Sequence, residues 1–104
     1  MPHRFDTWRD QIQTAKSAKD VGQVVNEYVA ALKPLLTSLP EDCQRALTPP
    51  INVQEAAVSI LMCELRFSGS DEVRAILHEI AHTFAAASMR LTSLYGGLRR
   101  NAAP

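Results

Sequence analysis

The residues best suited to chemistry lie at positions 78–82, which read His-Glu-Ile-Ala-His. Two histidines four positions apart lie one turn apart on a helix, so both imidazoles can ligate one divalent ion. A glutamate between such ligands can act as a general base toward a metal-bound water. The spacing therefore raises the hypothesis of a zinc-dependent hydrolase that uses His78, Glu79 and His82.

These five residues resemble the HExxH motif of zinc peptidases, but the remaining sequence lacks what that chemistry needs. A catalytic zinc usually takes three protein ligands, and no His, Asp, Glu or Cys follows His82. The metzincin pattern would require Gly and His where this chain has Ala85 and Ser88. We therefore predict no catalytic residues, no bound metal and no cofactor, and we expect the protein not to be an enzyme. The hydrolase is kept as the alternative.

The two cysteines match neither a redox motif nor the short spacing of a zinc site. Cys43 and Cys63 are each expected to act as small buried hydrophobes. A non-catalytic, metal- or pH-responsive binding role for the histidine pair stays open. Its further ligands would come from Cys43, Cys63, Glu79 or a second subunit.

Glu64 is the candidate buried charge, because it projects from an apolar arc of the predicted helix 52–67. A buried carboxylate must be paired or protonated. We expect it to pair with an arginine or to reach solvent at the edge of the arc. The candidate partners are Arg45, Arg74 and Arg90.

The elements that must position these groups are all helical. Apolar residues recur every three to four positions, and no run of alternating residues predicts a strand. We predict an all-α, single-domain bundle of four main helices plus a short connecting helix, without a sheet. The predicted helices cover residues 7–16, 18–37, 40–47, 52–67 and 71–95, and the helix over 18–37 is kinked or interrupted at Pro34. Gly96-Gly97 ends the last helix, so residues 97–104 form a frayed tail.

The helix over 52–67 is apolar on nearly all sides. One side carries Val53, Ala56, Ala57, Ile60, Leu61, Cys63 and Phe67, and the other carries Val58, Met62 and Leu65. Such a helix is typical of the centre of a bundle or of a partner contact. The helix over 71–95 is much longer and is expected to overhang the bundle.

A second side of that longer helix combines small residues with one methionine, which permits close helix approach. We interpret this side, together with part of the helix over 52–67, as a dimer or partner interface, with a solvated alanine-rich face as the alternative. Its residues are Ala75, His78, His82, Ala85, Ala86, Met89 and Ser93.

Composition narrows the classes of function. The chain carries 11 Lys plus Arg and 11 Asp plus Glu, so its formal net charge is zero and no basic footprint for nucleic acid is present. No run is long and apolar enough to predict a signal peptide or membrane span. We expect a cytoplasmic protein-protein interaction module of the adaptor, chaperone or inhibitor type. Its partner would be itself, as a homodimer, or another protein, with no nucleic-acid, membrane or small-molecule partner.

Overall fold

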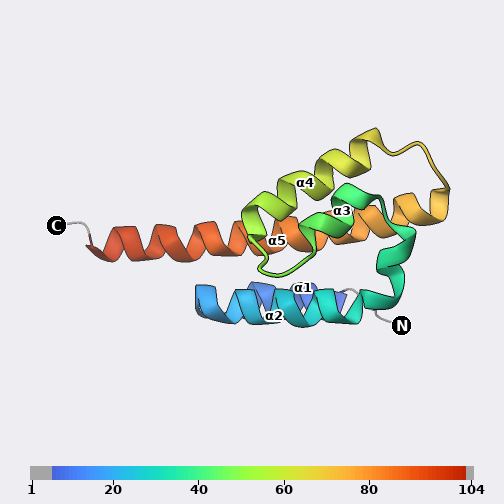
Figure 1. The fold of residues 1–104 in the computed structure, drawn as a ribbon. Coiled ribbons are helices and arrows are strands. Elements are labelled where there is room, and N and C mark those ends of the chain that lie inside the picture. Colours follow the sequence, from blue (N-terminus) through green and yellow to red (C-terminus); the bar gives the residue numbers. More distant parts are fainter. Residues whose placement is uncertain (1–5, 103–104) are drawn as a thin grey trace.

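The computed structural model describes the backbone of residues 6–102 and the side chains of residues 7–95. Within this part of the chain every regular element is a helix (Figure 1). The predicted all-α bundle of four main helices is confirmed. In chain order the elements are α1 (Asp6–Thr14), α2 (Ala18–Ala31), a 3-10 helix (Lys33–Ser38), α3 (Glu41–Ala46), α4 (Val53–Arg66) and α5 (Asp71–Ala102).

The helices begin where the sequence provides capping side chains. Ser17 Oγ accepts a hydrogen bond of 3.1 Å from the backbone N–H of Asp20 at the start of α2. Asn52 Oδ1 accepts one of 3.1 Å from the N–H of Glu55 at the start of α4. Each bond satisfies one N–H that has no partner within its own helix. The starts of α2 and α4 are therefore determined by local sequence.

Pro34 separates two elements rather than kinking one. Of the two predicted alternatives for residues 18–37, the interruption is confirmed and the kinked single helix is wrong, since α2 ends at Ala31 and a 3-10 helix follows. Proline has no N–H, and its ring clashes with the carbonyl four residues earlier in an α-helix. The next residue instead makes the tighter 3-10 contact, in which Leu35 N–H donates to Leu32 O over 2.8 Å.

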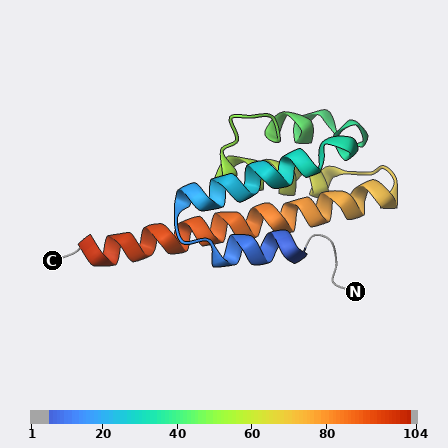
Figure 2. The same ribbon diagram turned by 90° about the horizontal axis from the view of Figure 1, so that it is seen from below.

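Helix α5 is the central helix of the bundle. It contacts α1 and α2 on one side and α4 on the other, while α3 packs on α4 (Figures 1 and 2). Of the two alternatives for the helix over 52–67, the centre of the bundle is therefore wrong, and a partner contact stays a prediction. Helix α4 buries Val53, Ala56 and Ile60 and leaves its other side uncovered.

The core contains aromatic side chains from three helices that pack against one another. Tyr28 of α2 and Phe84 of α5 are fully buried, with ring centroids 6.3 Å apart. Trp8 of α1 meets Tyr28 edge-on at 5.8 Å. Arg90 adds a polar tie, because its Nε donates to the carbonyl oxygen of Ala15 over 2.9 Å. These contacts fix α1 and α2 against the middle of α5.

Helix α5 extends beyond the bundle at its C-terminal end, as expected from its length (Figure 1). The predicted end at Gly96-Gly97 is wrong, because the helical backbone continues to Ala102. A glycine ends a helix by adopting a left-handed conformation, and a helical backbone through both glycines excludes that role. Residues 103 and 104 of the predicted tail lie outside the described residues.

Candidate functional site

The Glu64 carboxylate of α4 meets the His78 imidazole of α5. His78 Nδ1 and Glu64 Oε1 are 2.6 Å apart, which is a short hydrogen bond. The Glu64 side chain is 19% exposed and that of His78 is 55% exposed. The contact therefore lies at the rim of the α4–α5 interface, with the histidine on the solvent side.

The prediction of an arginine partner for Glu64 is wrong, because each candidate binds elsewhere. Arg74 Nη2 donates to the carbonyl oxygen of Phe67 over 2.8 Å, and Arg90 donates to Ala15. Arg45 makes ion pairs within α3, at 3.4 Å to Glu41 and 3.8 Å to Asp42. Arg74 and Arg90 thus bind backbone carbonyls at helix ends, and Arg45 binds acidic neighbours on its own helix.

The HExxH residues divide between two sides of α5. The rings of His78 and His82 lie edge-to-face, with centroids 4.4 Å apart, on the side toward Glu64. Glu79 instead faces α1, where its carboxylate lies 3.7 Å from the Arg9 guanidinium. Consecutive helical residues point about 100° apart, so this division follows from helix geometry. Within residues 7–95, no group of three or more His, Cys, Asp or Glu side chains is arranged to hold a metal ion.

The predicted interface on α5 is an exposed surface of mostly small side chains. Ala75, His78, His82, Ala85, Met89 and Ser93 are exposed and Ala86 is half-buried. Met89 is the large apolar group on this surface, with 73% of its area accessible.

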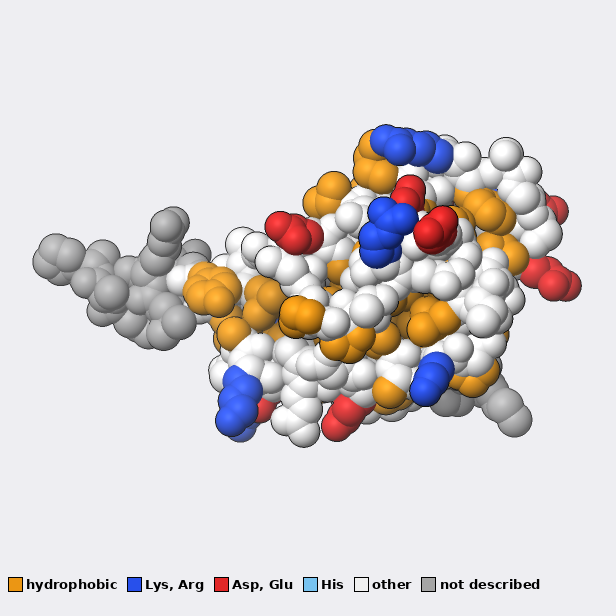
Figure 3. Space-filling view, in the orientation of Figure 1, with side chains coloured by type: hydrophobic (Ala, Val, Ile, Leu, Met, Phe, Trp, Pro, Cys, Tyr) orange, Lys and Arg blue, Asp and Glu red, His pale blue; other side chains and the backbone are white. Residues whose placement is uncertain are grey.

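A more apolar surface lies on α4, the helix that the sequence indicated as the centre of a bundle or a partner contact. Val58, Leu61, Met62 and Leu65 are 62, 48, 39 and 72% exposed, respectively. At 100° per residue they form one stripe nearly opposite Ile60. We call these four residues the α4 stripe; Figure 3 shows hydrophobic side chains over this helix along the upper edge of the molecule. The signal in the sequence was an apolar arc wider than one neighbouring helix can cover.

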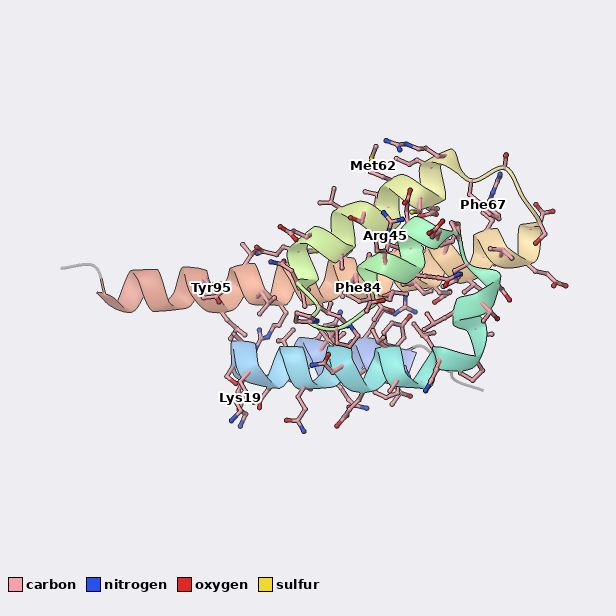
Figure 4. The ribbon with its side chains drawn as sticks, viewed as in Figure 1. Lys19, Arg45, Met62, Phe67, Phe84 and Tyr95 are labelled. Carbon is pink, nitrogen blue, oxygen red and sulfur yellow. The ribbon has the colours of Figure 1, made fainter. Side chains whose placement is uncertain are left out.

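An open groove of about 870 Å³ runs beside the α4 stripe, between α3 and α4. Val58 and Met62 belong to both the stripe and the groove wall, and Arg45 and Phe67 line it from its other sides (Figure 4). The groove is thus an apolar channel with a charged border, continuous with the stripe.

The cysteines are unpaired thiols. Cys43 is fully buried, and burial raises the pKa of its thiol to about 12. Burial also raises the pKa of the half-buried Cys63, which lines the α3–α4 groove. A thiol with a raised pKa holds little of the reactive thiolate at neutral pH, so neither side chain is set up as a nucleophile.

The fold and surfaces define a small all-α protein with an uncovered apolar helix face. None of the described helices combines the length and apolar character that crossing a membrane requires. No family model, curated protein or solved structure matches the chain.

Proposed function

We propose that this chain is a non-catalytic protein-protein interaction module that self-associates through the α4 stripe. The observation that carries the proposal is four large apolar side chains exposed together at helical spacing. An amphipathic helix with anchors at such positions is a common element of helix-mediated recognition. Contiguous exposed apolar surface on a small protein marks an interaction site.

The α4 stripe is a better interface than the small-residue side of α5. Burial of apolar area contributes about 25 cal/mol per Å², so large exposed side chains supply more stabilisation than alanines. The α4 stripe offers four such side chains, whereas Met89 stands among Ala, Ser and His on α5. The proposed contact therefore uses the helix over 52–67 and leaves the side of α5 free.

The occupant we propose is a second copy, because the charges bordering the stripe are self-complementary. Glu55 and Arg66 lie on the Met62 edge of the stripe, near its two ends, about 16 Å apart along the axis. Both are exposed, and neither side chain forms an ion pair within the described residues. An antiparallel pair of α4 helices brings Glu55 of each copy toward Arg66 of the other.

The same twofold arrangement pairs the apolar side chains. An axis through the stripe centre, between Leu61 and Met62, sets Val58 against Leu65 of the other copy. Glu55 then lies within about 3 Å, along the helix axis, of the other copy's Arg66. A parallel pairing would instead gather two glutamates at one end and two arginines at the other. The charge pattern therefore selects the antiparallel contact.

Charge reversal tests this arrangement. Glu55→Arg or Arg66→Glu alone places like charges at both symmetric contacts, whereas the double variant Glu55→Arg/Arg66→Glu restores opposite charges. At about 0.5 kcal/mol per exposed pair, each single change costs about 2 kcal/mol, a loss of roughly 30-fold in dimer affinity. Sedimentation velocity over a concentration series measures the affinities, with Glu27→Arg on exposed α2 as the control.

In the double variant the stability of the fold should fall while the dimer affinity recovers. This difference separates an effect on the dimer contact from an effect on folding. Glu55 lies in the first turn of α4 and Arg66 in the last, so both favour the helix dipole. The double variant should therefore have the lowest melting temperature of the set while regaining dimer affinity. Dimer affinity that falls in parallel with melting temperature across the set would overturn the antiparallel pairing.

The compartment we propose is the cytoplasm, where thiols stay reduced. Cys43 and Cys63 are both unpaired, and disulfides are rare in that compartment. Charges of both signs border the proposed contact, which supports a protein surface rather than nucleic acid as the partner. An adaptor, chaperone or inhibitor would use such a dimer to present its remaining surfaces.

A further inference from the structure

We propose that His78 and His82 bind a divalent transition-metal ion, with Glu64 as the residue that orients His78. The site lies on α5, away from the α4 stripe, and does not depend on self-association. Imidazole suits Zn²⁺, Cu²⁺ and Ni²⁺, so the ligand class is a borderline transition-metal ion rather than Mg²⁺ or Ca²⁺.

The Glu64 contact determines which nitrogen of His78 is available. With Nδ1–H donating to Glu64 Oε1 over 2.6 Å, the neutral ring carries its free lone pair on Nε2. Metal-binding histidines commonly donate their second ring N–H to a carboxylate, which fixes the ring and raises its basicity. The Glu64 side chain is only 19% exposed and belongs to α4, so its carboxylate holds the His78 ring in a fixed orientation.

His82 supplies the second ligand one helical turn further along α5. Its ring centroid is 4.4 Å from that of His78. A tetrahedral ion with bonds of about 2.0–2.1 Å to both rings would place the centroids about 5 Å apart. The separation of the two rings is therefore close to that of a chelating pair. His82 makes no hydrogen bond to another described residue and is exposed, so its side chain can rotate freely.

The site is a binding site with two protein ligands. Both histidines are exposed, so water can fill the remaining coordination positions. Glu79 is held against Arg9 on another side of α5 and lies outside the site. The Glu64 carboxylate balances part of the positive charge of the ion. Metal capture without hydrolysis is the chemistry that this arrangement supports.

Calorimetric titration with ZnCl₂, CuSO₄ and MgCl₂ tests the site on the full chain. His3 is the other histidine in the sequence, so every protein in the set carries His3→Ala. We expect one ion per chain, tighter binding of Cu²⁺ than of Zn²⁺, and no heat from MgCl₂. His82→Ala should abolish zinc binding, and Glu64→Gln should weaken it by about 10- to 100-fold.

A matched control separates the orienting role of Glu64 from a general effect of removing one negative charge. Glu27→Gln removes a carboxylate from exposed α2 and should leave the zinc affinity unchanged. Zinc binding that survives His82→Ala would overturn the site, and equal affinities for Glu64→Gln and Glu27→Gln would overturn the orienting role. Circular dichroism of each variant confirms that helix content is kept. Self-association of His82→Ala should equal that of its parent, so failure of the metal site is distinguishable from failure of the dimer.

Discussion

Replacing Leu65 with glutamate is the most informative perturbation of the α4 stripe. Leu65 is 72% exposed in the single chain, so the substitution should change the free energy of unfolding of the monomer by no more than about 0.5 kcal/mol. In the proposed dimer each Leu65 is buried against Val58 of the other copy. Burial of a leucine side chain contributes about 1.5 kcal/mol or more, and the twofold axis repeats the change.

The expected loss for Leu65→Glu is therefore at least about 3 kcal/mol, which weakens the dimer by roughly a hundredfold or more. Met89→Glu is the matched control, because Met89 is 73% exposed and lies on α5 outside the α4 stripe. Sedimentation velocity gives the dissociation constants, and thermal melts followed by circular dichroism verify folding. Unchanged association in Leu65→Glu would refute the reasoning. Dissociation by Met89→Glu alone would assign the interface to α5.

The remaining predictions concern the stability of the fold. Arg90→Ala should lower the free energy of unfolding by about 1–3 kcal/mol in urea titrations, because the carbonyl of Ala15 loses its 2.9 Å hydrogen bond; an unchanged urea midpoint would contradict this role. Burial raises the pKa of Tyr28 from 10.0 to about 12, against a lowering effect from a hydrogen bond with Thr83. The neutral phenol therefore stabilises the fold fully below pH 10, and this contribution disappears as the pH rises to 12. Unfolding followed by Trp8 fluorescence should show this loss, and Tyr28→Phe should reduce it; an equal loss in Tyr28→Phe would assign the pH dependence to other groups, Cys43 among them.

The helices could be predicted because their signals are local. Ser17 and Asn52 cap α2 and α4 through residues three positions away, within the reach of a sequence pattern. The break at Pro34 is also local, although whether the chain bends or changes helix type depends on how the following residues pack. Gly96-Gly97 failed as an end signal because glycine only permits the left-handed conformation and does not impose it.

The site residues were harder to predict because their roles depend on packing across helices. The apolar arc of α4 shows that the helix has two apolar sides, but only the topology shows which one α5 covers. Glu64 pairs with His78 because α4 crosses α5 at that level, and sequence spacing carries no information about the crossing. The exposure of Ala75, His82 and Met89 followed the helical phase, so that part of the predicted interface lies at the surface as expected.

The molar mass of the unaltered chain over a dilution series tests the central claim most directly. Sedimentation equilibrium should give about twice the chain mass of 11.5 kDa at high concentration. On dilution the mass should shift reversibly toward that of a single chain. Repeating the series with Leu65→Glu should move the dimer to concentrations that are higher by roughly a hundredfold or more. A wild-type protein that stays at the single-chain mass at every concentration of the series would contradict self-association through the α4 stripe.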